Sequence, residues 1–180
     1  MRQLRERGAS LVEVGLILPV LILMAVGLSE IGFLVVDYLT VTNAAREGAR
    51  TGAAAADFPT ADDLILQAVE EASCNLRFGD LELVRVFKAD AVGDPIVGSI
   101  NEYTPSGSGL ACDSPLIDLS CANGCPWVAS SRDRVPPTLD VLGVELTFSH
   151  TSVTGIFPFP TVDWTETAVM QVEPDTRGTQ

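Results

Sequence analysis

The stretch that decides the fold lies near the start of the chain and reads GASLVEVGLILPVLILMAVGLSEIGFLVV over residues 8–36. From Leu11 onward it holds only two charged residues, Glu13 and Glu30. A helix from Leu11 to the end of this stretch would measure about 39 Å at ~1.5 Å per residue, which exceeds the ~30 Å hydrocarbon core of a bilayer. We therefore predict a transmembrane helix over residues 9–36.

The basic residues at the N-terminus predict the orientation of this helix. Arg2, Arg5 and Arg7 all precede the apolar stretch. Because basic flanks are retained in the cytoplasm, residues 1–8 should form a cytoplasmic leader and the chain after the span should be exported. A cleaved secretory signal is the alternative, but the apolar stretch is longer than a usual signal core and no A-x-A site follows it before Ala53–Ala56.

The charge and length of the chain exclude some functional classes. The chain has 180 residues, enough for one domain and an anchor. Its 24 acidic residues exceed its 11 basic ones, so the formal net charge is −13. Such a surface repels nucleic-acid phosphates and no basic patch offsets it, so we expect no nucleic-acid partner.

Four cysteines lie in the part predicted to be exported. An even number of cysteines in an exported domain favours disulfides, of which three pairings are open. A zinc site is the alternative, but the closest pair has C-x3-C spacing and no histidine nearby, so we expect no metal. The four candidates are Cys74, Cys112, Cys121 and Cys125.

Glu13 is unusual because a carboxylate inside a membrane span costs about 2.5–3.5 kcal/mol on insertion scales and usually marks a function. An interfacial glutamate that reaches water is the simpler interpretation. If the chain were cut between Gly8 and Ala9, however, Glu13 would become the fifth residue of the new chain. The ammonium of Ala9 could then pair with Glu13 of an adjacent subunit, and neutralising both charges would make their burial tolerable.

Two motifs carry a family resemblance. The basic leader, the Gly8–Ala9 pair, Glu13 and the apolar helix resemble a type IV prepilin peptidase site. The segments EIGF at 30–33 and VTNAAREGAR at 41–50 resemble the TadE-like domain of the Tad (Flp) tight-adherence pilus system. The resemblance covers about residues 6–54, and a weaker one lies at 167–173. Residues 57–160 match no motif.

The resemblance implies a structural protein without catalytic activity. It implies a minor pilin or pseudopilin in the bacterial cytoplasmic membrane, with its N-terminus in the cytoplasm. A prepilin peptidase would cut it between Gly8 and Ala9, and a separate cytoplasmic ATPase would supply the energy. Its partners would be other pilins and the Tad assembly platform. The alternative is an unprocessed, signal-anchored binding module that recognises its ligand through residues 101–137.

A stripe of small residues predicts that the helix continues outside the membrane over residues 37–56. Gly and Ala on one face let a neighbouring backbone approach closely, so this stripe should pack against the exported domain or another helix. Asp37 is expected to fall off this stripe. A flexible Ala/Gly linker is the alternative. The stripe consists of Leu34, Tyr38, Val41, Ala45, Gly48 and Gly52.

The exported part, residues 57–173, predicts an α+β fold with an antiparallel sheet. A helix is expected from Ala61 to Ser73, capped by Thr60, with Leu64, Ile65, Ala68 and Val69 on its buried face. A disulfide-tied excursion should occupy residues 101–137, and 174–180 should form a flexible tail. Four strands are expected at 81–89, 96–100, 141–150 and 163–172.

No catalytic constellation stands out, so neither an enzyme nor a cofactor or small-molecule substrate is expected. The one histidine, His150, follows Ser149 in a predicted strand, where neighbouring side chains point to opposite faces. Residues 106–109 lack the lysine and the helix of a phosphate loop. Two aspartate pairs could attract calcium, although neither has EF-hand spacing. These pairs are Asp90 with Asp94 and Asp113 with Asp118.

Overall fold

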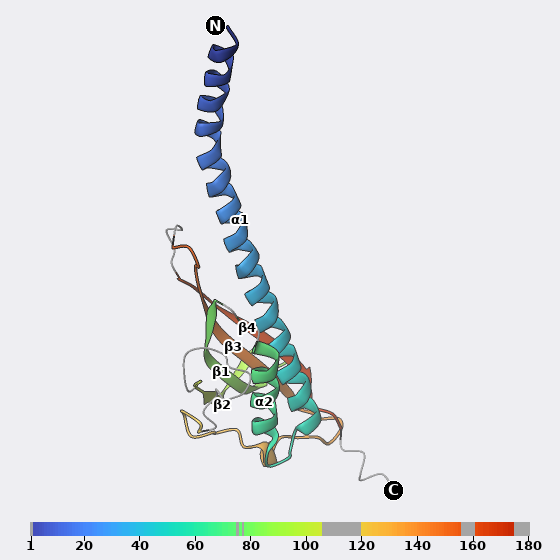
Figure 1. Ribbon diagram of the computed structural model, residues 1–180. Helices are drawn as coiled ribbons and strands as arrows, with labels where there is room; N and C mark the ends of the chain where they lie inside the picture. Colours follow the sequence, from blue (N-terminus) through green and yellow to red (C-terminus); the bar gives the residue numbers. More distant parts are fainter. Residues whose placement is uncertain (1, 75, 77, 106–119, 156–160, 175–180) are drawn as a thin grey trace.

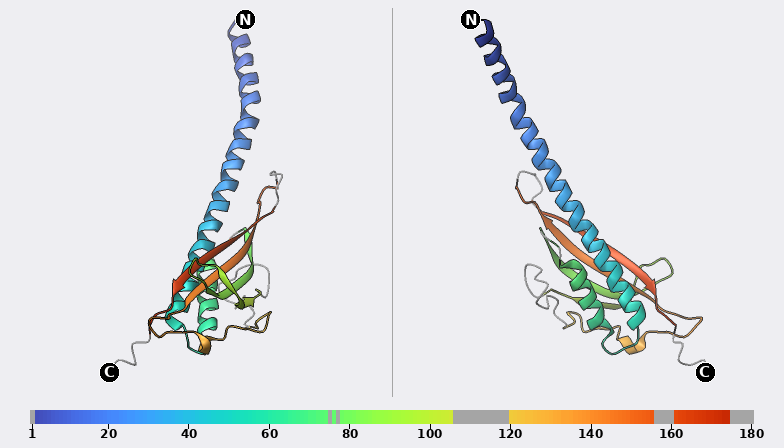
Figure 2. Two further views of the ribbon diagram at one scale, coloured as in Figure 1. Left: turned by 180° about the vertical axis from the view of Figure 1, so that it is seen from behind. Right: turned by 45° about the vertical axis from the view of Figure 1, so that its right-hand side comes forward.

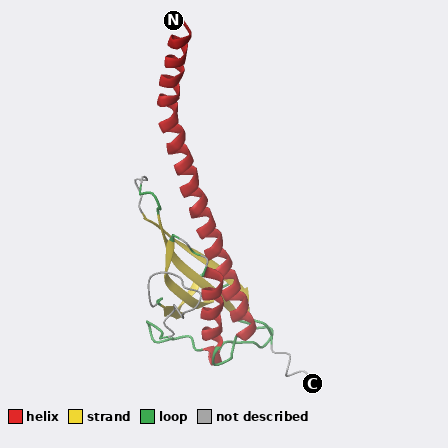
Figure 3. Ribbon diagram, viewed as in Figure 1, coloured by secondary structure: helices red, strands yellow, loops and turns green. Residues whose placement is uncertain are grey.

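A computed structural model describes residues 2–74, 76, 78–105, 120–155 and 161–174, with side chains from residue 11 onward. A long helix carries a small domain built from a second helix and a four-stranded antiparallel sheet (Figures 1 and 3), which is the α+β fold predicted. The elements are α1 (Arg2–Ala55), α2 (Ala61–Ser73), β1 (Gly79–Ala89), β2 (Pro95–Tyr103), the 3-10 turn η1 (Ala129–Ser131), β3 (Val141–Thr151) and β4 (Thr161–Gln171).

Helix α1 is continuous over 54 residues and passes through Pro19 without a break in its helical assignment. Its first half stands clear of the domain and its second half lies against the sheet (Figure 1). The helix ends where Ala56 adopts a positive φ of 32°. The Ala- and Gly-rich stretch before this point is therefore helical, and the flexible-linker alternative is wrong.

The four strands form a sheet in the order β2-β1-β3-β4, and every neighbouring pair is antiparallel. Strands β3 and β4 are paired from Val141↔Gln171 to Thr151↔Thr161. The turn between β1 and β2 is closed by Asp90, whose carboxylate accepts the N–H groups of Val92 and Asp94, each at 2.9 Å. The β3–β4 hairpin points back along α1 toward the N-terminus (Figure 1).

Both helices cover one face of the sheet (Figure 2), and the hydrophobic core lies between the two layers. Helix α1 contributes small side chains, α2 contributes larger aliphatic ones, and β3 lies at the centre of the sheet. Representative core residues with no more than 1% exposure are Val41, Ala45, Ile65, Val69, Val144 and Leu146.

The close approach of α1 to its neighbours requires glycine at position 52. A Cβ atom at Gly52 would lie 2.7 Å from Cδ1 of Ile65 on α2 and 2.8 Å from Cδ2 of Leu142 on β3. The same position thus faces both α2 and the sheet. The predicted stripe is the packing face from Val41 onward, since Val41, Ala45, Gly48 and Gly52 are all buried. It is wrong at Tyr38, which is 41% exposed.

Several local predictions need correction. Thr60 precedes α2, but its side chain makes no capping hydrogen bond. The buried face of α2 includes Leu66 rather than Leu64, which is 38% exposed. Leu64 and the half-buried Ala68 instead line the open groove between α1 and α2, whereas Leu66 belongs to the core. Strand β2 extends to Tyr103, so the excursion predicted over 101–137 begins with three residues of strand.

Replacing Gly52 with leucine should lower the free energy of unfolding by at least about 1 kcal/mol, despite the gain in helix propensity, because added atoms in a packed core force neighbouring side chains to shift. Thermal and urea unfolding followed by circular dichroism in detergent would measure this. Ala54→Leu is the matched control, since Ala54 is exposed on the same helix. Equal destabilisation by the two changes would contradict the close packing described here.

Candidate functional site: the N-terminal helix and the hairpin that contacts it

The residues predicted for processing and assembly all lie in the first part of α1. Gly8 and Ala9 are helical, one turn before Glu13. The side chain of Glu13 is exposed, and no hydrogen bond or ion pair joins it to another of the residues described. Among the described residues, the fold therefore brings no hydrogen-bond or ion-pair partner from the domain to Glu13.

The surface of α1 from Leu11 to Ser29 is apolar and bare. The large side chains that are exposed there range from 50% exposure at Leu18 to 76% at Leu11. In the part of the chain that the structure describes, α1 is the one helix long and apolar enough to cross a membrane. Because an apolar surface of this size is unfavourable in water, the structure supports membrane anchoring through this segment.

Glu30 marks the point where the helix meets the domain. Its side chain is only 5% exposed, although it follows directly after the bare stretch. The backbone N–H groups of Val153 and Thr154, at the tip of the β3–β4 hairpin, donate to its two carboxylate oxygens at 3.1 and 2.6 Å. The hydroxyl of Thr154 adds a third hydrogen bond of 2.6 Å. Glu30 thus fixes the hairpin tip to the helix.

A second polar contact lies two turns farther along the same face of α1. The carboxylate of Asp37 lies 2.8 Å from Nδ1 of His150 on β3. Both residues are buried, with 1% and 3% of their surface exposed. The prediction that Asp37 lies off the packing stripe is therefore wrong. Its spacing from Glu30 and from Val41 places it on the stripe, which could have been noticed in the sequence.

His150 is a structural residue in this arrangement. Its ring points to α1, and Ser149 belongs to the opposite face of the strand, as expected for neighbours in a β-strand. No nucleophile and base are brought together at this position among the described residues. The aromatic rings beside it continue the contact between helix and hairpin, since Tyr38 lies 6.1 Å from Trp164, measured between ring centroids.

A polar network at the far end of the domain was not predicted. Asp62 of α2 pairs with the buried guanidinium of Arg132 and accepts hydrogen bonds from Tyr103 at 2.6 Å and from Asn101 at 2.8 Å. Burial, together with the Asp62 carboxylate, raises the pKa of the Tyr103 phenol. The guanidinium also lies 4.4 Å above the ring of Trp127. This network ties the loop after residue 120 to α2 and β2.

The cysteines are only partly accounted for. Cys121 and Cys125 form a disulfide, which confirms that disulfides are present and pairs two of the four candidates. Cys74 is half-buried at the end of α2. Cys112 lies outside the described residues, as do residues 106–109, Asp113 and Asp118. No group of three potential metal-ligating side chains occurs within the described ranges.

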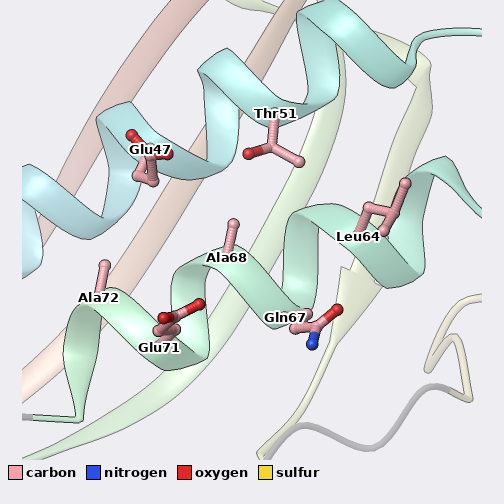
Figure 4. A pocket seen from close by; sticks show the side chains of 7 residues that line it. All are labelled: Glu47, Thr51, Leu64, Gln67, Ala68, Glu71 and Ala72. Carbon is pink, nitrogen blue, oxygen red and sulfur yellow. The ribbon is translucent and has the colours of Figure 1, made fainter.

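A shallow groove of about 500 Å³ runs between α1 and α2 on the side away from the sheet (Figure 4). Glu47 and Thr51 face it from α1, and Glu71 faces it from α2. The groove is open to solvent and holds none of the residues predicted for processing or assembly. It is lined by Glu47, Thr51, Leu64, Gln67, Ala68, Glu71 and Ala72.

The fold and these contacts define an α+β domain carried on a long apolar N-terminal helix. Residues 8–50 match the protein family described as TadE-like protein, so the chain contains a TadE-like domain there. This family implies a role in assembly of the Tad pilus. The match spans the Gly8–Ala9 pair, Glu13, Glu30 and Asp37. No curated protein and no solved structure matches the chain.

Replacing His150 with leucine should lower the free energy of unfolding by roughly 3 kcal/mol, because it leaves the carboxylate of Asp37 buried without this partner. Replacing both residues with leucine should recover a large part of the loss, since no buried charge remains. Urea unfolding of the full chain in detergent would measure both variants, with the exposed Thr151→Ala as a control. A double variant as unstable as the single one would contradict the pairing.

Proposed function

We propose that this chain is a non-catalytic minor pilin, or pseudopilin, that takes part in assembly of a Tad-type pilus used for adhesion. The observation that carries the proposal is the bare apolar surface of α1 with one carboxylate, Glu13, inside the TadE-like domain. The chain has 180 residues, whereas the family resemblance implies a much shorter major pilin. This difference favours a minor component.

The proposed topology has the basic leader, residues 1–8, in the cytoplasm and the domain on the exported side of the bacterial cytoplasmic membrane. We place the end of the membrane span near Ser29 rather than at Val36. The support is that Glu30 and Asp37 are both buried against the domain. The face of this segment that contacts the β3–β4 hairpin cannot be surrounded by lipid, while Ile31, Val35 and Val36 remain exposed on the rest of its surface.

Glu13 would act in contacts between subunits. After cleavage between Gly8 and Ala9 by a prepilin peptidase, the new ammonium at Ala9 would stand four residues from this carboxylate. A pair formed between neighbouring chains would neutralise both charges in an apolar bundle. The exposure of Glu13 and the lack of a described partner within its own chain are consistent with a role between chains.

The second half of α1 would couple movement of the membrane segment to movement of the exported domain. Val41, Ala45 and Gly52 are buried in the domain core, so the helix cannot move without the domain. Extraction of the helix from the membrane by the assembly platform would therefore carry a folded domain with it. This property suits a subunit of a filament or of its initiation complex.

The competing function is an unprocessed, membrane-anchored binding module. It would use residues 101–137, tied by the Cys121–Cys125 disulfide, to recognise a surface. The two proposals differ in the fate of the leader, because only a pilin requires the new N-terminus. Nothing in the described residues favours the binding module specifically, so we propose the pilin.

The chain isolated from piliated cells should begin at Ala9, and replacing Gly8 with leucine should leave the leader attached and abolish its incorporation into pili. Intact-mass spectrometry of the purified chain would measure both results. A normal pilus that contains the chain with its leader intact would contradict the proposal and favour the binding module.

Replacing Glu13 with glutamine should leave membrane insertion unchanged but reduce pilus assembly strongly, because the carboxylate that pairs with the new ammonium is removed. Carbonate-resistant membrane association and electron-microscopic counts of pili would measure these two properties. Glu47→Gln is the matched control, since Glu47 lies on the same helix and makes only a surface ion pair with Arg50. Equal numbers of pili in the two variants would contradict a role for Glu13.

A further inference from the structure

The β3–β4 hairpin reaches α1 at Glu30, the first buried residue after the bare stretch, and covers one face of the helix there, while Ile31, Val35 and Val36 stay exposed. Leu28 is 67% exposed, whereas Glu30 is 5% exposed and accepts hydrogen bonds from the hairpin tip. Figure 1 shows the hairpin running along α1 toward its N-terminal half. Among the described residues, this hairpin makes the hydrogen bonds to α1 that lie nearest to the apolar segment.

The length of the bare segment matches the thickness of a bilayer. From Leu11 to Ser29 it spans about 28 Å at ~1.5 Å per residue, against ~30 Å for the hydrocarbon core. If this segment fills the core, as the proposed function requires, Glu30 lies at the level of the headgroups on the exported side. The hairpin tip bound to Glu30 must then lie at the same level.

Two contacts hold the hairpin in this position. Glu30 binds the tip through three hydrogen bonds, and Asp37 binds His150 two turns farther along the same face. A hairpin fixed at two points along the helix cannot swing away from the membrane. The donors at the tip also satisfy the Glu30 carboxylate, so it does not stand as an unmatched acid at the membrane surface.

We propose that the tip of the β3–β4 hairpin, described at residues 152–155, rests on zwitterionic phospholipid headgroups of the exported-side leaflet. This inference rests on the proposed function, which supplies the membrane. Val153 is 47% exposed, and Thr154 and Gly155 are exposed beside it. Asp80 and Asp163 are exposed farther along the same end of the sheet and would repel anionic headgroups.

A photoreactive benzoylphenylalanine at position 153 would test this contact in the full chain. The chain would be reconstituted in vesicles of phosphatidylethanolamine and phosphatidylcholine, irradiated, and analysed by mass spectrometry for lipid adducts. We expect an adduct from position 153 and none from position 97. Val97 is the matched control because it is a valine with 94% exposure on β2, which lies on the other side of β1 from this hairpin.

The outcomes separate the inference from the function on which it rests. A chain that alkaline carbonate removes from the vesicles overturns the proposed membrane span and the inference with it. A carbonate-resistant chain without an adduct at position 153, but with the thermal unfolding of the wild type, overturns the inference alone. A larger adduct yield in phosphatidylglycerol vesicles overturns the assignment to zwitterionic headgroups.

Discussion

Two carboxylates on one face of α1 constrain how the domain sits on its helix. Glu30 and Asp37 lie on the same face of α1 as the packing stripe. The face that packs against the domain core therefore also buries two acidic side chains. Buried carboxylates are stable only with donors, and the β3–β4 hairpin supplies them through Val153, Thr154 and His150. The register of the hairpin along the helix is therefore determined by polar contacts and not only by the fit of apolar surfaces.

This constraint gives one helix two roles. From Leu11 to Ser29 no residue of α1 is buried, whereas from Glu30 one face is buried against the domain and the other still exposes Ile31, Val35 and Leu39. The small residues farther along, such as Gly48 and Gly52, let α2 and the sheet approach the helix backbone closely. A domain joined to its anchor by a shared helix, without a linker, moves as that helix moves.

Helices and strands that carry a pattern within their own segment could be predicted from the sequence. The bounds of α2 and the presence of strands at β1 and β3 follow from local patterns, and they were found correctly. The roles of Glu30 and Asp37 depend on a hairpin more than a hundred residues away, and periodicity cannot reveal which partner arrives there. The network around Asp62 and Arg132 was missed for the same reason, because its members come from α2, β2 and the loop after residue 120.

Hydrogen exchange of the full chain in lipid nanodiscs, measured along a urea series, tests the division of α1 most directly. The account predicts that amides before Ser29 keep their protection after the domain unfolds, because the bilayer holds them. Amides after Asp37 should lose protection together with β1 and β3. Loss of protection along the whole of α1 in a single transition, or rapid exchange before Ser29 in the folded protein, would contradict a helix divided between membrane and domain.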